Sequence, residues 1–413
     1  MNKSEFLAAL GVGALSPRAE AVYEVASKAS ATDGNSFLSV PFLKGLEAEY
    51  ALFGNMLSFV LESAKTVREN KALALCSYLV REMLTARERG SILPLADLPQ
   101  PDAARFGSAF EMALYFAELS CLPDMVAYDR AHGVPATITV DTLRDCFGGA
   151  LQKSPVYLGR NGFELGRNFE WNQYYLNHNI YRVGVLNFER RKLVDNSMRI
   201  LTDGRGEYRI LAAEQGQGVG ACGHLQGALF VDDAAFTVSF EETETAYVGH
   251  PVDSLRATVS PETVSLSKNE WHLAITPEDD VISVHIPENT NFSPELVEKA
   301  YRDARAFFTA CFPHFCPKAY TCFSWMMAGE LPQILREGSN ILAFQRRYLR
   351  FPLKGVGRGV LAFVFGKPIA EVGGFTAYHT LPEATSLQRN IKALYVNGQA
   401  VYEAAGIFFP VGC

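Results

Sequence analysis

The segment "VISVHIPENTNFSP", residues 281–294, places a histidine where a predicted β-strand ends. An imidazole accepts and releases a proton near neutral pH, so His285 is a candidate general base. A second predicted strand, residues 319–327, carries Cys322 and Ser324, residue types that act as nucleophiles or proton donors. A structural interpretation is also open, in which His285 and Ser324 bond to neighbouring groups and Cys322 fills space in a core.

A helix is predicted between these two strands. Ser293 suits the N-cap, Pro294 suits the first helical position, and apolar residues then recur at helical spacing until Phe312. A strand, a crossover helix and a second strand place residues 281–287 and 319–327 parallel to each other. Ligands collect at the carboxyl ends of such strands, where the three polar side chains lie. Whether those side chains share one face depends on the register, which the sequence leaves open.

The chain is longer, at 413 residues, than one core usually supports, so two domains are expected. Residues 1–155 have helical periodicity, apart from one short β-like run, "ATITV". Short strands predominate after that, and from residue 281 strands and helices alternate as in βαβ units. We predict an α+β protein with a helical N-terminal domain, residues 1–155, and a mixed α/β C-terminal domain, residues 156–413, that carries a β-rich insertion.

Several segments lead to specific assignments. The apolar spacing in residues 58–84 predicts one amphipathic helix, and "ARFGSAFEMALYFAELSCL" predicts a more buried one. A further helix is expected to begin at Asp141 or Thr142. The aromatic and β-branched residues of "FEWNQYYLNHNIYRVGVLNFERR" predict two antiparallel strands joined near Asn177-His178-Asn179. The runs "GALFVD" and "GVLAFVFG" predict two more strands.

Charge and cysteine content exclude several classes of protein. A net charge of −7 argues against a broad nucleic-acid interface, which needs clustered Lys and Arg. The first twenty residues fit neither a signal peptide nor a membrane span, so a cytoplasmic location is expected. The eight cysteines contain no C-x-x-C pair and are expected to be reduced thiols. The segment "CFPHFCPKAYTC" has thiol and imidazole ligand types, but its spacing fits no common zinc motif, and no metal is expected.

Several separated motifs occur in the same order as in a known family. They are "HGVPATITVDTLRDCF", "RNGFELGRNFEWNQYYLNHNIYRVGVLNFE", "VISVHIP", "CFSWMM", "EGSNILAFQRRY" and "LPEATSLQR". On these motifs the chain resembles, nearly end to end, bacterial proteins described as acyltransferase domain-containing, with a helical N-acyltransferase N-terminal domain and a GNAT-like C-terminal domain. The resemblance implies a GNAT-like fold for the second domain and transfer of an acyl group from a CoA thioester to an amine.

The resemblance also implies a site for CoA. In such folds two neighbouring parallel strands splay apart, the thioester lies between them, and the CoA diphosphate sits at the N-terminus of the following helix. Here the first strand would be "VISVHIP", and the CoA-binding positions would be Ile286, Thr290, Asn291 and Ser293. The usual phosphate signature of that loop, Gln or Arg, two residues, Gly, any residue, then Gly or Ala, is missing from "ENTNFSP". Glu288 and Glu295 place negative charge there instead.

Three functions remain open at this stage. The first is an N-acyltransferase in which the amine attacks the thioester directly, with His285 as base, a backbone N–H near Ile286 polarising the carbonyl, and Ser324 positioning or donating a proton. The second is a non-catalytic ligand-binding protein on a degenerate GNAT-like scaffold. The third is a covalent acyl hydrolase or transferase with Cys322 as nucleophile. The expected partners are acyl-CoA and a small-molecule amine or acyl acceptor, while the oligomeric state is open.

Overall fold

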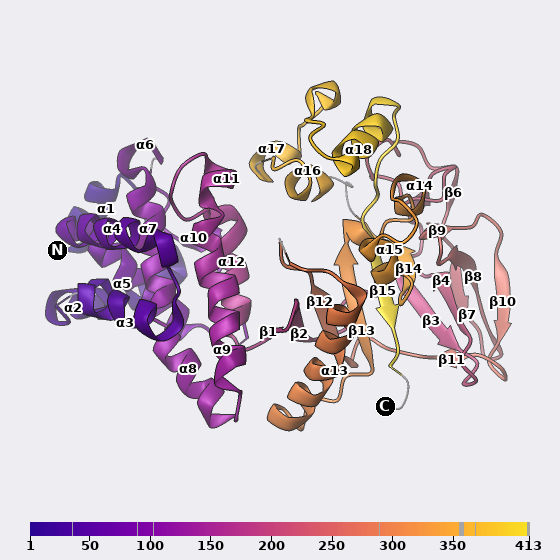
Figure 1. The fold of residues 1–413 in the computed structure, drawn as a ribbon, viewed down its shortest axis with the longest axis horizontal. Helices are drawn as coiled ribbons and strands as arrows, with labels where there is room; N and C mark the ends of the chain where they lie inside the picture. Colours follow the sequence, from indigo (N-terminus) through magenta and orange to yellow (C-terminus); the bar gives the residue numbers. More distant parts are fainter. Residues whose placement is uncertain are drawn as a thin grey trace. The chain divides into compact units, whose positions relative to one another are not determined.

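The chain folds into two compact units, Met1–Val183 and Gly184–Cys413 (Figure 1). The first unit is helical and continues past residue 155, where we expect the domain boundary, because α11, α12 and β1 belong to it. The second unit contains the sheets. The computed structural model describes residues 1–34, 36–88, 90–101, 103–288, 290–354, 359–367 and 369–410.

The N-terminal unit consists of helices and one short strand. Its regular elements are α1 (Lys3–Leu10), α2 (Pro17–Thr32), α3 (Val40–Tyr50), α4 (Leu57–Glu69), α5 (Lys71–Ala86), α6 (Ala103–Phe106), α7 (Ser108–Leu119), α8 (Leu122–Ala131), α9 (Ala136–Leu143), the π-helical turn η4 (Arg144–Gly148), α10 (Gly149–Gln152), α11 (Ser154–Leu158), α12 (Leu165–Leu176) and β1 (Ile180–Val183).

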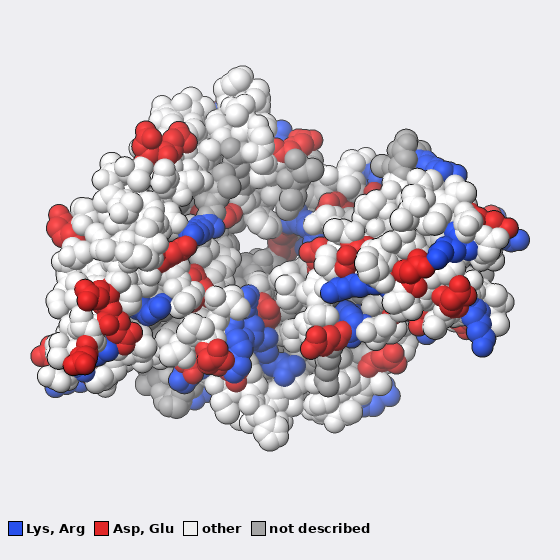
Figure 2. All heavy atoms as spheres, turned by 180° about the vertical axis from the view of Figure 1, so that it is seen from behind, with Lys and Arg blue, Asp and Glu red and all other residues white. Residues whose placement is uncertain are grey.

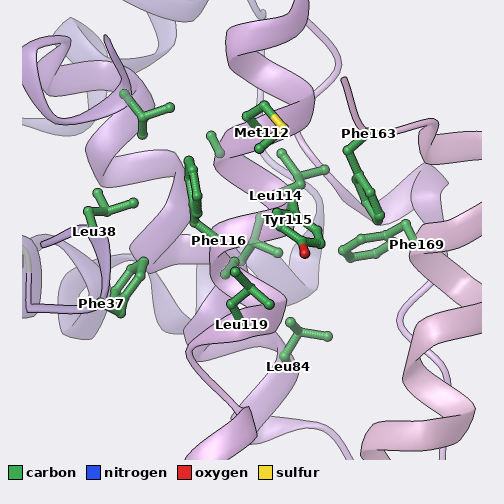
Figure 3. Packing of buried hydrophobic residues seen from close by; sticks show 14 of the residues in the cluster. Phe37, Leu38, Leu84, Met112, Leu114, Tyr115, Phe116, Leu119, Phe163 and Phe169 are labelled. Carbon is green, nitrogen blue, oxygen red and sulfur yellow. The ribbon is translucent and has the colours of Figure 1, made fainter. Parts of the chain in front are cut away.

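Helix α7 lies in the centre of this unit's core, as its apolar sequence predicts (Figure 3). The ring of Tyr115 on α7 lies 5.0 Å from the ring of Phe163, centroid to centroid. Its hydroxyl donates a hydrogen bond of 3.0 Å to the carbonyl of Phe147. A fully buried tyrosine needs such a partner, because an unpaired buried hydroxyl is costly. The partner therefore allows the whole Tyr115 side chain to be buried.

Asn70 divides the single helix that the sequence predicts over residues 58–84 into α4 and α5. Its side-chain oxygen accepts hydrogen bonds from the backbone N–H groups of Ala72 and Leu73, at 3.1 and 3.2 Å. Asparagine is a strong N-cap because it satisfies N–H groups that have no partner within the helix. The apolar periodicity continues across Asn70 and hides the break.

The β-strand assignments in this unit are wrong in two places. The run "ATITV" lies within α9, which passes directly into η4, so no new helix begins at Asp141 or Thr142. The first half of "FEWNQYYLNHNIYRVGVLNFERR" is α12. The buried positions of α12 include Phe169, Asn172, Gln173 and Leu176, which follow a helical spacing. This spacing outweighs the local β propensity of the aromatic residues.

The second unit contains a main sheet with the order β2-β12-β13-β15-β14. Only β12 and β13 are parallel, as predicted for residues 281–287 and 319–327, and the other pairings are antiparallel. The strands are β2 (Leu186–Lys192), β12 (Asp280–His285), β13 (Ala319–Ser324), β14 (Leu349–Pro352) and β15 (Ala404–Phe408).

Helix α13 (Pro294–Cys311) packs against one face of the main sheet. Ser293 is its N-cap, as predicted, and accepts a hydrogen bond from the N–H of Leu296. The ring of Tyr301 on the helix meets Phe188 of β2 and Tyr320 of β13 edge-on, with centroids 5.6 and 5.1 Å apart. These contacts follow from the apolar stripe of α13, which the sheet buries.

A second sheet packs against the opposite face of the main sheet, where apolar residues of both form one core. Its strand order is β10-β8-β4-β3-β11, with β7 and β9 paired to β8. All its strands lie between β2 and β12 in the chain, which confirms a β-rich insertion. They are β3 (Met198–Thr202), β4 (Tyr208–Ala212), β7 (Phe240–Glu242), β8 (Ala246–Asp253), β9 (Thr258–Val259), β10 (Val264–Ser267) and β11 (His272–Leu273), and a separate ribbon joins β5 (Gly218–Val219) to β6 (Phe236–Thr237).

Two predicted strands of this unit are absent from the described structure. "GALFVD" forms a turn in which Gly227 and Phe230 have φ values of 94° and 63°, a region that a strand cannot include. "GVLAFVFG" contains α16, because an uninterrupted apolar run does not distinguish a buried helix from a strand. The remaining helices of the unit are α14 (Leu331–Ile334), α15 (Asn340–Gln345), α16 (Gly359–Phe363), α17 (Ile369–Val372) and α18 (Ser386–Val396).

The surface carries charges of both signs. Lys and Arg side chains lie among Asp and Glu side chains across the face shown in Figure 2. Interspersed charge of this kind is typical of a solvated protein surface. None of the helices that the structure describes combines the length and the hydropathy needed to span a bilayer.

Candidate active site

Strands β12 and β13 stop pairing before either strand ends. Their parallel pairing covers residues 281–283 and 319–321 only. Beyond it, β12 remains paired with β2 as far as His285, and β13 remains paired with β15 as far as Ser324. Each strand is thus held by its outer neighbour while the two inner edges separate. We call this point the split between β12 and β13.

The register decides which side chains share a face of the sheet. Ser283 is paired with Thr321, so alternation puts His285 on the face of Thr321 and puts Cys322 and Ser324 on the opposite face. The face that carries His285 is turned toward the second sheet, and the other is covered by α13. The structure therefore does not bring the His285 side chain together with Cys322 or Ser324.

His285 is paired with a buried carboxylate. Its Nε2 atom lies 2.9 Å from Oε2 of Glu189 on β2, and the Glu189 side chain is 5% exposed. The β2–β12 register places Glu189 beside Ser283 and on the same face as His285. A carboxylate that accepts a hydrogen bond from the ring N–H orients the imidazole and stabilises its protonated form. This arrangement suits a residue that takes up a proton.

Arg191 lies on the same face of β2 as Glu189, two residues further along. Its Nη1 atom is 3.6 Å from the Glu189 oxygen that pairs with His285. A buried carboxylate is costly unless it is paired and hydrogen-bonded, and Glu189 has both an imidazole and a guanidinium close by. The three side chains form a chain of contacts from Arg191 through Glu189 to His285.

The surroundings of Cys322 and Ser324 indicate structural rather than catalytic roles. Burial raises the pKa of the Cys322 thiol to about 12, so the thiol is protonated at neutral pH. A protonated thiol in a closed core is a poor nucleophile. The Ser324 hydroxyl accepts a hydrogen bond of 3.1 Å from the N–H of Met326 and caps the short 3₁₀ helix that follows β13.

The side chains of the expected CoA-binding loop bond within the loop and to the residue before β2. The Thr290 hydroxyl donates to the carbonyl of Val185 at 3.2 Å, and the Asn291 side chain accepts from the N–H of Ser293 at 3.3 Å. Ile286 follows β12 directly and is half-buried. Asn289 of this loop lies outside the described residues.

Glu295 occupies the first turn of α13. A hydrogen bond from its own backbone N–H and one from Ser293 lower the pKa of its carboxyl group. A negative charge at a helix N-terminus is stabilised by the helix dipole and by unpaired N–H groups. The position that would attract a phosphate therefore already has an anionic side chain.

The thiols of the "CFPHFCPKAYTC" segment differ in their surroundings, since Cys311 and Cys322 are buried and Cys316 is exposed. Within the described ranges, no three His, Cys, Asp or Glu side chains converge as metal ligands would.

Glu189 and Arg191 were not identified from the sequence. The run "LNFERR" places Asn187, Glu189 and Arg191 on one face of a strand, and this alternation is visible in the sequence. What the sequence does not reveal is the partner strand, because β2 and β12 are separated in the chain by the whole β-rich insertion.

A helical unit followed by a mixed sheet with a split parallel pair defines an α+β protein with a GNAT-like domain. The model of the family described as the GNAT-like C-terminal domain matches residues 180–408, and the chain belongs to this family. No curated protein matches the sequence.

Solved structures resemble the chain over its whole length. An acyltransferase in complex with decanoyl-CoA and teicoplanin is 15% identical, with a TM-score of 0.62 over 99% of both chains. An acyltransferase in complex with decanoyl-CoA is 16% identical, with a TM-score of 0.60 over 99% of this chain and 100% of that one. An acyltransferase mutant in complex with octanoyl-CoA is 16% identical, with a TM-score of 0.62 over 99% and 100% of the two chains. At this identity the likeness establishes the fold.

Proposed function

We propose that the protein transfers an acyl group from a CoA thioester to an amine acceptor by direct attack. The observation that carries this proposal is the split between β12 and β13, with His285 at its edge and a buried carboxylate holding the imidazole. A split parallel pair offers a thioester a row of backbone groups that no neighbouring strand uses. The pairing of His285 with Glu189 suits a base.

The reaction needs three proton and charge movements, and the site has a group for the first two. An amine reaches the site as an ammonium ion and must lose a proton, which His285 accepts. The amine nitrogen then bonds to the thioester carbon, and a backbone N–H near Ile286 stabilises the negative charge that develops on the carbonyl oxygen. The carbon–sulfur bond breaks, the new amide nitrogen gives up its extra proton, and the departing CoA thiolate takes up a proton in its place.

Glu189 supports this role through electrostatics. When His285 takes up a proton, the imidazolium lies 2.9 Å from a carboxylate oxygen in a poorly solvated position. Opposite charges at that distance attract strongly where water is excluded. Glu189 is accordingly a positioning residue, while His285 is the residue that contacts the reacting amine.

The co-substrate follows from the fold and from the structures that share it. Those structures contain decanoyl-CoA and octanoyl-CoA. We extend this to the present chain and propose acyl-CoA as the acyl donor, with medium-length chains as the first to test. The buried, protonated thiol of Cys322 favours direct attack over an acyl-cysteine intermediate.

A second function is favoured by one specific observation. The loop before α13 has no glycine, and Glu295 already occupies the anion position at the helix start. A protein with this loop binds a CoA diphosphate weakly, unless other groups compensate. The second candidate is therefore a ligand-binding protein on the same scaffold without acyl-transfer activity.

One experiment tests the proposed function. The purified protein is incubated with acetyl-, octanoyl- or decanoyl-CoA and either a panel of primary amines or teicoplanin, which one of the similar structures contains. Free CoA thiol is measured with a chromogenic disulfide, and the acceptor is examined by mass spectrometry. We expect acceptor-dependent thiol release and a product heavier by one acyl group. Calorimetric binding of acyl-CoA without a product from any amine would favour the second candidate.

A further inference from the structure

Two hydroxyl groups lie buried side by side at the point where β12 and β13 separate. Ser283 and Thr321 are the last paired residues of the two strands. Their exposed fractions are 0% and 2%. Neither Ser283 Oγ nor Thr321 Oγ1 has a hydrogen-bond partner among the residues that the structure describes. Both side chains point to the face that carries His285 and Glu189.

Buried hydroxyl groups are normally hydrogen-bonded, because a hydroxyl removed from water without a partner is unfavourable. Two such groups on adjacent strands, beside a buried carboxylate, therefore point to a shared partner. The β2–β12 register places Glu189 on one side of Ser283, and Thr321 lies on the other. Glu189, Ser283 and Thr321 thus form a row across three strands. The two hydroxyl groups can donate or accept hydrogen bonds and the carboxylate can accept them, and a buried water molecule requires partners of these kinds.

We propose that Ser283, Thr321 and Glu189 bind one buried water molecule, and that this network fixes the carboxylate that orients His285. The water site stands on the geometry of the three strands, while the positioning role rests on the proposed acyl transfer. Ser283 and Thr321 are positioning residues, since they act on the imidazole through the water and Glu189.

The line of polar side chains across β2, β12 and β13 does not continue past Thr321. Beyond Thr321 the next residue in the row is Ile407 on β15, which is fully buried and has no group that exchanges protons. A relay needs donors and acceptors at every step. The row therefore ends inside the core between the two sheets.

Two substitutions at Thr321 separate the hydroxyl from its packing. Thr321→Val keeps the shape of the side chain and removes the hydroxyl, whereas Thr321→Ser keeps the hydroxyl and removes a methyl group. We expect Thr321→Val to lower the melting temperature by roughly 2–4 °C, because the water and Glu189 lose a partner. We expect Thr321→Ser to retain the water, seen in a high-resolution crystal structure within hydrogen-bond distance of both hydroxyl groups.

Steady-state kinetics test the positioning role. The valine variant is expected to lose about ten-fold in kcat with KM for acyl-CoA unchanged, and the serine variant to recover most of the loss. Ser283→Ala should behave like the valine variant, and the double variant should lose little more, because both residues hold one water. The opposite order of melting temperatures overturns the proposal. In that case the valine variant melts at or above the wild-type temperature, the serine variant melts below it, and the crystal structure has no density for the water.

These readouts also separate this proposal from the proposed function. The order of the melting temperatures and the crystallographic water do not depend on turnover. If no acyl transfer is found, they still decide whether the water site exists, and only the positioning role is lost.

Discussion

The imidazole of His285 and the carboxylate of Glu189 are 2.9 Å apart although 96 residues separate them in the chain. Antiparallel pairing of β2 with β12 creates this contact, and the β-rich insertion lies between the two strands in sequence. The insertion does not contribute to the pair directly. It packs on the face of the main sheet where the pair lies, and Glu189 is buried on that face.

Replacing His285 by alanine should lower kcat for acyl transfer by at least about 100-fold, because general-base catalysis by a positioned side chain contributes roughly that much or more. Far-UV circular dichroism should remain unchanged, since the His285 side chain is partly exposed and sits at a strand end. The matched control is His272→Ala, an exposed histidine on β11. Equal turnover in both variants would remove His285 from the mechanism.

Glu189→Gln should lower kcat by about 100-fold, because a poorly oriented base lies outside the attack geometry. Glutamine keeps the shape of the side chain but removes the charge opposite the imidazolium. KM for acyl-CoA should change little, since Glu189 is buried and acts through His285. Glu262→Gln, at an exposed position of the same unit, is the control. A change in KM alone would place Glu189 in substrate binding instead.

Cys322 should resist alkylation in the folded protein. With a pKa of about 12, roughly one thiol in ten thousand is ionised at pH 8, and the side chain is also closed off from solvent. Iodoacetamide followed by peptide mass spectrometry should modify the exposed Cys222 and Cys316 first. Urea should make all sites react. Rapid labelling of Cys322 under native conditions would return the covalent mechanism to consideration.

Glu118 should make the stability of the helical unit depend on pH. Burial raises its pKa well above the usual value, against weaker opposing effects of Asn172 and Arg87. Between the pKa of the unfolded chain and the raised pKa of the folded protein, the folded state binds more protons. The free energy of unfolding therefore falls as pH rises through that window.

The Glu118→Gln variant tests this dependence. Glutamine still accepts the hydrogen bond that Asn172 donates to Glu118, and it has no charge to bury. Urea unfolding followed at pH values from about 5 to 9 should show a smaller loss of stability for this variant than for the wild type. Glu62→Gln, at an exposed position on α4, should follow the wild type. Parallel curves for all three proteins would contradict a buried ionisable Glu118.

Local signals in the sequence were sufficient for the helix after His285. Ser293 and Pro294 mark its start, and the spacing of apolar residues defines its buried face. The parallel relation of β12 and β13 followed from the strand–helix–strand order. These features depend on neighbours in the chain, so one sequence contains the information.

The rest of the candidate site depends on register and on distant pairing. A shift of one residue between β12 and β13 would have put Cys322 on the face of His285, and no local rule decides between the two registers. Glu189 needed knowledge that β2 pairs with β12. In α12 the helical spacing of Phe169, Asn172 and Leu176 was present, but the aromatic content of the segment favoured a strand.

The outer strands β2 and β15 keep the ends of β12 and β13 apart before any ligand arrives. A ligand that enters there breaks no hydrogen bond between these two strand ends, and it contacts main-chain atoms first. Recognition through main-chain atoms is insensitive to which side chains line the opening. If the proposed donor is held through main-chain atoms in this way, we expect substitutions at residues 322–324 to leave donor binding largely unchanged.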